Sequence, residues 1–389
     1  MKVINVALPA AAPHNYEIHV GVNILPALGN FARGCVEEKI KRVCLVSNSK
    51  IFKLHGEAAQ KSLQNAGWSV SVFLMPDGEQ YKNWRVLEQT LAFFSAQKLT
   101  RSDLVIAFGG GVVGDLAGFA AAIFQRGVPF VQVPTTFLAQ IDSSVGGKTA
   151  VNTVFGKNLI GAFHQPNGVL VDLATLCTLQ PRELRAGLYE AIKHGAIASR
   201  ALFEQTAEFL QKFPPANFKR DFAAPEFRFE LERLITKNIE FKAEIVAGDE
   251  REETERADAR SRRILNFGHT VGHALEKVTG YKRFKHGEAV GIGMLAAAEI
   301  SYQIGKTSKH ELNLLCKLIE SVGKLPSAND IEPETIVAAF AHDKKTVGDS
   351  FKWILLGGLG RAEIVDDQII PKEIVREAVS AALKNQTQN

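Results

Sequence analysis

The chain has only four cysteines among its 389 residues, and they are scattered along it. Cys35, Cys44, Cys177 and Cys316 form no CxxC pair, which excludes a cysteine zinc site of the usual spacing. The same scatter argues against a disulfide-stabilised secreted domain. Reduced thiols in a cytoplasmic protein are the simpler interpretation, and we expect that location.

The sequence also lacks long apolar runs and a strong excess of one charge. No apolar stretch approaches the about 18 residues that a membrane-spanning helix needs, and no signal-peptide pattern opens the chain. The formal net charge of +4 is small for this length and argues against nucleic acid as the main partner. With 46% apolar and 23% charged residues, the composition is that of a globular protein long enough for two domains.

The two halves of the chain differ in pattern. Short β-branched runs alternate with helical stretches up to about residue 180, which predicts an α/β domain with a parallel sheet. The runs are Val43–Val46, Val70–Phe73, Leu104–Phe108, Phe130–Val133 and Gly168–Val171. From Pro181 onward, amphipathic segments such as Leu184–Ile197 and Thr270–Lys277 predict a mainly α-helical domain. We therefore predict domains over 1–180 and 181–389, with the charged run Asp249–Arg263 as a solvated loop or helix extension.

Three of the 10 histidines stand close together near a carboxylate. His269 and His273 are spaced i, i+4, so their rings lie on one face of a helix, and His286 follows with Glu288. Imidazole is the commonest metal ligand and titrates nearest neutral pH. The spacing alone indicates His269 and His273 as joint metal ligands, and buried structural histidines are the alternative.

A glycine motif, Gly109–Asp115, follows the apolar run Leu104–Phe108 and opens the helical stretch Leu116–Phe124. A strand, a glycine turn and a helix N-terminus together form an anion site, because free backbone N–H groups and the helix dipole face the anion. The spacing fits G-x-G-x-x-G, although no acidic residue ends the next strand, Phe130–Val133. A dinucleotide site is the prediction, and a plain tight turn is the alternative.

A second glycine segment, Asp142–Thr149, contains Gly147-Lys148-Thr149 and looks like a P-loop. That motif needs a glycine five residues before Gly147, where Asp142 stands, and a carboxylate there would repel phosphate. An NTPase is therefore disfavoured. Lysines at the starts of glycine-rich loops, together with Glu190 and Lys193 on one helix face, favour a site for an anionic substrate.

Several long motifs resemble those of the 3-dehydroquinate synthases, the sugar-phosphate cyclases of the shikimate pathway. They span roughly residues 40 to 355, and several are long enough to be specific to this group. The segments that carry the resemblance are Asp77–Lys82, Gly109–Asp115, Gln132–Asn152, Lys157–Gly161, Gly187–Gly195, Leu265–Glu276 and His286–Val290.

The resemblance implies an N-terminal Rossmann-like domain that binds NAD and a helical C-terminal domain that holds a divalent metal, zinc or alternatively cobalt. It implies a small sugar-phosphate substrate between the domains and a homodimer. The implied reaction converts 3-deoxy-D-arabino-heptulosonate 7-phosphate to 3-dehydroquinate and phosphate. It runs through transient oxidation at C5, elimination of phosphate, re-reduction and intramolecular aldol closure, so the net reaction is that of a lyase.

The resemblance also assigns residues. The metal ligands become Glu190, His269 and His286, and His273 meets the substrate instead. The implied catalytic residues are Asp142, Lys148, Lys193, Lys242 and His273. The implied substrate-binding residues are Arg126 from the partner subunit, Lys148, Lys157, Asn158, Lys193, Lys242, Arg262, Asn266, His273, Lys344 and Lys345. The implied cofactor-binding residues are Asn48, Asp77, Gly78, Glu79, Lys82, Gly110, Gly111, Val112, Val113, Gly114, Asp115, Thr135, Thr136, Asp142, Lys148, Lys157, Thr175, Leu176 and Thr178.

Two positions depart from the family pattern. Asn48 stands where an aspartate is expected for a two-point grip on the ribose. The stretch between Lys242 and Asn266 is longer than the pattern asks, and Arg262 is chosen because it stands four residues before Asn266. Two alternatives stay open: a sister cyclase that makes a valiolone or an inosose, and an iron-type alcohol dehydrogenase with net redox output.

Overall fold

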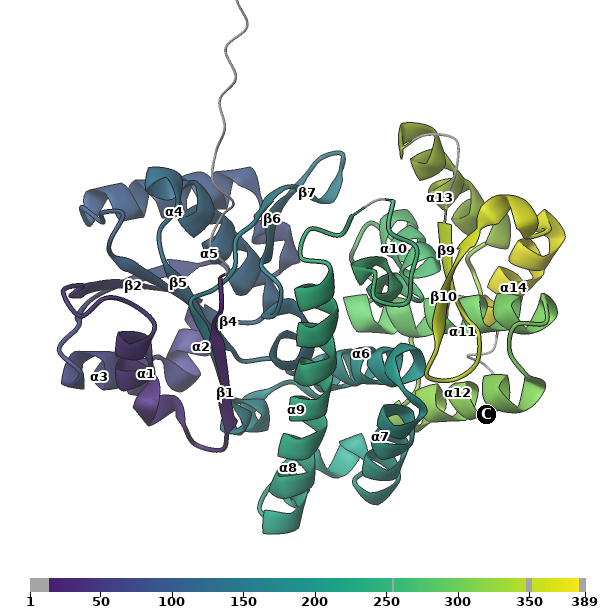
Figure 1. Ribbon diagram of the computed structural model, residues 1–389, viewed down its shortest axis with the longest axis horizontal. Coiled ribbons are helices and arrows are strands. Elements are labelled where there is room, and N and C mark those ends of the chain that lie inside the picture. Colours follow the sequence, from purple (N-terminus) through teal and green to yellow (C-terminus); the bar gives the residue numbers. More distant parts are fainter. Residues whose placement is uncertain (1–13, 254, 348–351, 385–389) are drawn as a thin grey trace, which may run out of the picture.

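The computed structural model describes residues 14–253, 255–347 and 352–384, and the side chains of all of these except 341–347 (Figure 1). Its first half is built on a six-stranded sheet in the order β1-β8-β5-β4-β2-β3, in which all neighbouring strands are parallel. The strands are β1 (Glu17–Gly21), β2 (Arg42–Asn48), β3 (Ser69–Met75), β4 (Leu104–Gly109), β5 (Phe130–Pro134) and β8 (Gly168–Asp172).

Helices cover both faces of this sheet because alternate residues of its central strands are apolar on each side. Leu45 and Ile106 belong to the buried cluster on one face, and Val46 and Val105 to the cluster on the other. The helices on the first face are α1 (Leu28–Gly34) and α3 (Glu57–Asn65), and those on the second are α4 (Trp84–Ala96) and α5 (Gly111–Ile123).

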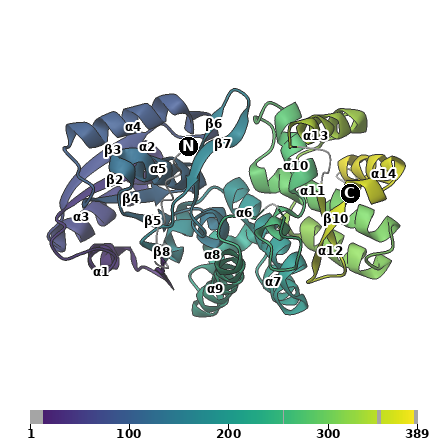
Figure 2. The same cartoon turned by 45° about the horizontal axis from the view of Figure 1, so that its top comes forward.

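A hairpin outside the sheet, β6 (Lys148–Thr153) and β7 (Gly156–Phe163), packs on α5 and projects toward the helical half (Figure 1). The helical half lies beside the sheet, as the turned view shows (Figure 2). Its helices are α6 (Pro181–Ala198), α7 (Arg200–Lys212), α8 (Phe218–Asp221), α9 (Pro225–Gly248), α10 (His269–Val278), α11 (His286–Gln303), α12 (Lys309–Val322), α13 (Pro333–Val347) and α14 (Lys372–Lys384). An antiparallel pair, β9 (Lys352–Leu356) and β10 (Ala362–Asp366), packs among them.

The α/β class with a parallel sheet and a mainly helical second half is confirmed. Each of the five predicted strand runs lies within a strand of the sheet, and both predicted helical segments lie within α6 and α10. The sequence pattern missed β1 and the pairs β6–β7 and β9–β10. The described residues of the charged run Asp249–Arg263 form a loop up to Ser261 and then a short 3-10 helix, Arg262–Asn266. Among the described residues, none of the helices has the length and apolar character to cross a membrane.

Helix α11 approaches α6 and α10 at glycines. A Cβ built on Gly287 would lie 1.8 Å from the Ala186 carbonyl oxygen, and one on Gly293 would lie 1.9 Å from the Gly268 carbonyl oxygen. Both neighbours are backbone atoms, which cannot give way as a flexible side chain can. The glycines therefore fix how closely α11 lies to the helices that carry Glu190 and His269.

We expect Gly287→Ala to destabilise the folded chain by about 3 kcal/mol, because the methyl group must push α11 away from α6. Thermal unfolding followed by circular dichroism measures the loss. Gly34→Ala is the matched control, since a Cβ at Gly34 meets nothing within 4 Å. Equal melting temperatures for the two variants would contradict the proposed close packing.

Candidate functional site

The candidate cofactor residues gather at one edge of the sheet. All strands of the parallel sheet end at the same edge. The chain runs from β2 outward to β3 and then crosses back to β4, on the other side of β2, so the order of the strands reverses between β2 and β4. Ligands of open α/β sheets bind at such a point. The segments there are Asn48 at the end of β2, Asp77–Lys82 after β3, Gly110–Asp115 after β4, Thr135 and Thr136 after β5, and Thr175–Thr178 after β8.

The glycine motif forms the turn from β4 into α5. Gly110 is the N-cap residue, and the helix begins at Gly111, five residues earlier than the sequence pattern predicted. A Cβ on Gly110 would lie 2.9 Å from Thr136, and one on Gly114 would lie 2.7 Å from the Gln132 side-chain oxygen. The turn thus needs glycine for close packing, and it leaves the first N–H groups of α5 without a side-chain cap.

Hydrogen bonds link the candidate cofactor residues to one another. Asn48 donates to Asp77 over 3.1 Å, and its side-chain oxygen accepts from the Ile51 N–H over 2.9 Å. Lys82 is buried and donates to both Asp115 and Asn158. The cofactor edge is therefore tied to β7, which carries Asn158.

A second group of charges is buried where α6 and α9 meet the turn Ala139–Ser143. Lys242 donates to Asp142, and His194 Nε2 lies 3.6 Å from the same carboxylate oxygen. Burial disfavours the Asp142 anion, yet Lys242 and Lys193 hold its pKa well below the usual range. Burial lowers the pKa of Lys242, whereas for Lys193 the opposing effect of Glu190 and Asp142 raises it.

Glu190, on α6, is fully buried and lacks hydrogen bonds. Lys193 Nζ lies 2.6 Å from Glu190 Oε2 and supplies one counter-charge, yet neither carboxylate oxygen has a hydrogen-bond partner. A buried carboxylate in this state is costly unless further donors or a second cation complete it. Glu190 Oε1 lies 3.5 Å from His286 Nε2, so the unsatisfied side faces the histidines.

The three histidines converge from α10 and α11. Ring centroids are 5.2 Å apart for His269 and His273, and 5.1 Å apart for His269 and His286. A nitrogen from each of the three lies within 4.8 Å of one from each of the others, as expected of a group that could hold a metal ion. The predicted histidine cluster is thus brought together.

Hydrogen bonds from Nδ1 orient two of the three histidine rings. His269 Nδ1 donates to the Phe267 carbonyl oxygen over 3.2 Å, and His286 Nδ1 donates to Glu276 over 3.2 Å. A carbonyl or carboxylate accepts only, so Nδ1 carries a proton, and Nε2 is the nitrogen that is left to bind a metal. Metal-binding histidines in proteins are oriented in this way.

The pKa values of the three rings differ: those of His269 and His273 are lowered, and that of His286 is raised. Burial, followed by Lys193 and the neighbouring rings, holds the pKa of His269 well below its usual range. Solvent reaches the His273 ring, but the surrounding protein still disfavours its cation and lowers its pKa to about 4. Burial acts in the same direction on His286, but the hydrogen bond that His286 donates to Glu276, together with the negative charge of Glu276, prevails and raises the pKa of His286. His269 and His273 are therefore neutral at pH 7.

Several of the predicted anion-binding residues contact carboxylates near the histidines. Lys157 Nζ lies 2.9 Å from Glu276, and Lys148 pairs with Glu252 from the charged loop. Asn266 donates to the same Glu252 over 3.1 Å. Both lysines of this predicted anion-binding set are therefore engaged by carboxylates.

Of four further predicted residues, the structure describes the side chains of two. Arg262 is buried, and its terminal nitrogens donate to the Gly146 and Glu250 carbonyl oxygens over 2.8 and 2.7 Å. Arg126 is exposed on the turn after α5, where its own φ is +63°. Lys344 and Lys345 lie in α13, but their side chains fall outside the described residues.

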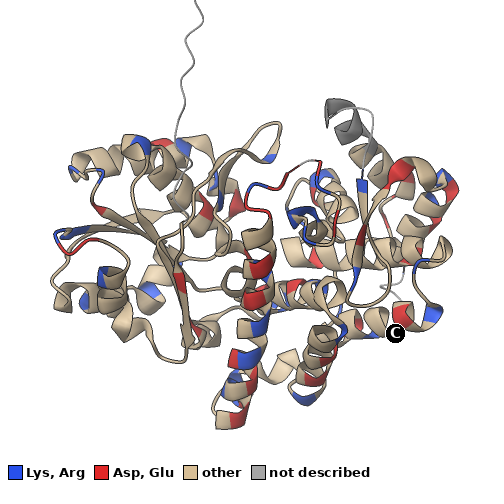
Figure 3. Ribbon diagram, in the orientation of Figure 1, with Lys and Arg blue, Asp and Glu red and all other residues tan. Residues whose placement is uncertain are grey.

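Sequence reasoning missed three residues that the structure places in the site. His194 is buried and donates from Nδ1 to Asn238 over 3.0 Å, with Nε2 left unsatisfied near Asp142. Glu276 orients His286 and pairs with Lys157; its spacing i, i+7 from His269 puts it on the same helix face and was a usable signal. Nothing in the pattern marked Glu252 among the charges of its loop (Figure 3).

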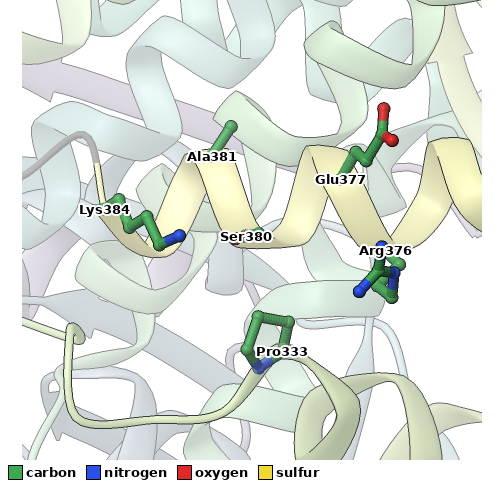
Figure 4. A pocket seen from close by; sticks show the side chains of 6 residues that line it. All are labelled: Pro333, Arg376, Glu377, Ser380, Ala381 and Lys384. Carbon is green, nitrogen blue, oxygen red and sulfur yellow. The ribbon is translucent and has the colours of Figure 1, made fainter.

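A hollow in the described part of the chain lies away from these residues. It has a volume of about 300 Å³ and lies between the start of α13 and α14 (Figure 4). Its walls include Pro333, Arg376 and Lys384, and none of its lining residues belongs to the candidate site. Convergent polar groups with shifted pKa values, and not hollow size, identify the site here.

Family models match most of the chain. The model described as 3-dehydroquinate synthase N-terminal matches residues 72–186, and the one described as 3-dehydroquinate synthase C-terminal matches 187–346. The 3-dehydroquinate synthase of Neisseria meningitidis serogroup C is 41% identical over 384 residues, which cover 98% of this chain and 100% of that one.

Two solved structures have the same fold. A 2-deoxy-scyllo-inosose synthase, complexed with carbaglucose-6-phosphate, NAD+ and Co2+, superposes with a TM-score of 0.78 at 25% identity, over 93% of this chain and 96% of that one. A 2-epi-5-epi-valiolone synthase from Streptomyces hygroscopicus, with NAD+ and Zn2+ bound, superposes with a TM-score of 0.82 at 22% identity, over 98% and 100%.

Proposed function

The chain belongs to the 3-dehydroquinate synthase family, and from that membership we propose that it converts 3-deoxy-D-arabino-heptulosonate 7-phosphate to 3-dehydroquinate and phosphate. One observation carries the proposal: an unsatisfied buried carboxylate, three converging histidines and a buried lysine–aspartate network adjoin one another in a chain 41% identical to such a synthase. The enzyme is a lyase that uses NAD and a divalent metal.

We propose Glu190, His269 and His286 as the metal ligands. Glu190 has two unsatisfied oxygens, and the two histidines have Nε2 free and Nδ1 oriented by an acceptor. His273 lacks such an orienting bond among the described residues, and solvent reaches it. Two imidazoles and one carboxylate with open positions make a catalytic zinc site rather than a structural one. Cobalt suits the same donor set.

We propose that NAD lies along the carboxyl edge of the sheet. Its pyrophosphate would meet the N–H groups at the start of α5, and the remaining contacts would come from the segments after β2, β3, β5 and β8. When bound, NAD takes up and returns a hydride, and the metal polarises substrate oxygens. The residues of the chain hold the substrate in one pose that serves each step.

The residues around the proposed metal ligands would donate hydrogen bonds to the substrate and accept protons from it. Lys193 stays protonated, because Glu190 and Asp142 raise its pKa, and it can donate a hydrogen bond to a substrate hydroxyl. Neutral His273 faces solvent and the substrate side, and it can accept a proton at Nε2 or Nδ1. Lys148, Lys157, Asn158 and Asn266 supply donors for the anionic groups, and Arg126 from a second subunit would complete the phosphate pocket.

We also propose that the protein is a homodimer, that it is located in the cytoplasm, and that its two domains divide at residue 180. The sister-cyclase alternative is disfavoured, because identity to the dehydroquinate synthase is 41% and identity to the inosose and valiolone synthases is 25% and 22%. A net dehydrogenase would not use the lysine-rich side of this site.

The test is turnover of the heptulosonate phosphate by purified protein with zinc and NAD. We expect phosphate and dehydroquinate to form in equal amounts over many turnovers with NAD present only at the enzyme concentration, because the hydride is returned. Absorbance at the NADH wavelength should not accumulate. Build-up of NADH in step with substrate consumption would instead support the dehydrogenase alternative.

A further inference from the structure

The charged loop after α9 places a carboxylate against the substrate side of the site. Glu252 pairs with Lys148, at the start of β6, and accepts a hydrogen bond from Asn266, three residues before His269. Lys148 and Asn266 come from opposite halves of the chain. Glu252 therefore bridges two donors that the proposed function assigns to the substrate.

The loop around Glu252 is built to hold it there. Asp249 accepts the Glu253 N–H over 2.9 Å and the Arg262 N–H over 2.8 Å, and Gln165 donates to Glu250 over 3.1 Å. These bonds fasten the chain on both sides of Glu252. Arg262 adds a bond to the Glu250 carbonyl oxygen.

The backbone at Glu252 supports the same conclusion. Its φ is +55°, a conformation that side chains other than glycine and asparagine rarely adopt. Such a conformation is unfavourable for a glutamate and persists only where neighbouring contacts impose it. The hydrogen bonds at Asp249 and Glu250, together with the two contacts of the Glu252 carboxylate, are the contacts that impose it.

We propose that Glu252 is a specificity-determining residue whose carboxylate occupies the position of an anionic group of the substrate. An anion reaching Lys148 and Asn266 must first displace it. Substrates that offer a strongly bound phosphate or carboxylate at this point can do so, and neutral sugars cannot. The proposal rests on the proposed function for the roles of Lys148 and Asn266.

The competition lowers apparent affinity by the fraction of molecules in which the anion position is free. The Lys148 side chain is 49% exposed and that of Glu252 21%, so their pair is partly screened by solvent. An effect of about two- to fivefold on substrate affinity is therefore expected from removing the charge.

The experiment compares Glu252→Gln with Glu253→Gln in the enzyme loaded with NAD and zinc. Glu253 is exposed and lies on the same loop, so its replacement changes the net charge equally. Glu252→Gln should lower KM for the heptulosonate phosphate by about two- to fivefold, and Glu253→Gln should match the parent enzyme. Glu252→Ala, which also removes the acceptor for Asn266, should shift KM in the same direction as Glu252→Gln.

Inorganic phosphate, titrated calorimetrically, gives a readout that does not need turnover. Both Glu252 variants should bind it more tightly than the parent enzyme, and thermal unfolding shows whether each variant is folded. An unchanged or higher KM together with unchanged phosphate binding in folded variants would overturn the proposal. Absence of turnover in the parent enzyme would instead overturn the proposed function and leave the phosphate comparison decisive for Glu252.

Discussion

Replacing Glu190, His269 or His286 by alanine is expected to remove tightly bound zinc and to lower turnover by about a thousandfold or more. Each residue would be one of three protein ligands, and a site with two ligands neither holds the metal nor keeps its geometry. Metal analysis of dialysed protein, alongside phosphate release from the heptulosonate phosphate, measures both losses.

His273→Ala is the matched control for this set. Its ring lies 5.2 Å from that of His269, so it is as close to the site as a ligand would be, yet it lacks an orienting hydrogen bond among the described residues. We expect this variant to keep zinc and lose rate. Should His273→Ala prove metal-free while His286→Ala retains zinc, the ligand assignment would be wrong, and His273 would take the place of His286 as a ligand.

Glu276→Gln tests the hydrogen bond that orients His286. The glutamine keeps the shape but withdraws the negative charge that orients His286 and pairs with Lys157. We expect zinc affinity to fall by about 10- to 100-fold, less than for loss of a ligand.

Mixing Arg126→Ala with Lys193→Ala is expected to restore activity that neither variant has alone. Arg126 is exposed on a turn whose backbone is held at positive φ, where a long cation contributes little to its own fold. If it completes the phosphate pocket of the second subunit, each heterodimer contains one site with both residues intact. An equal mixture after full subunit exchange should then reach about a quarter of the parent activity.

The doubly substituted chain provides the control for this experiment. Mixed with the parent chain, it forms heterodimers in which one site lacks Arg126 and the other lacks Lys193. Exchange should therefore reduce the activity of that mixture by about half. No recovery in the first mixture, despite heterodimers shown by native mass spectrometry, would mean that Arg126 acts within its own chain or not at all.

The sequence predicted the buried strands well because their apolar runs are continuous. Val43–Val46 and Leu104–Phe108 are covered on both faces, so the run itself indicates a strand in a parallel sheet. Strand β1 is half-exposed, and its sheet partner is far along the chain, so no local pattern marks it. Most of β7 faces solvent, so its sequence lacks the apolar pattern of a buried strand. The hairpin β6–β7 therefore shows in the sequence only as lysine and glycine motifs.

The site was predicted at the level of residue types and missed at the level of contacts. Glu190 and the three histidines were indicated by motif and resemblance, and the structure brings them together. The pairing of Lys148 with Glu252 depends on a loop whose register the sequence did not fix. Likewise, Arg262 was chosen by spacing, while its guanidinium is engaged by two carbonyl groups that only the folded chain supplies.

The pairing of β1 with β8 has a consequence for how the protein is made. Among the described strands β1 pairs only with β8, so residues 17–21 find their sheet partner at residues 168–172. At ribosomal rates of about 5–20 residues per second, β8 leaves the ribosome roughly 8 to 30 seconds after β1. Strand β8 also pairs with β5, so its arrival completes this end of the sheet. A nascent chain stalled before residue 168 would expose the open edge of β5 to chaperones or to other nascent chains.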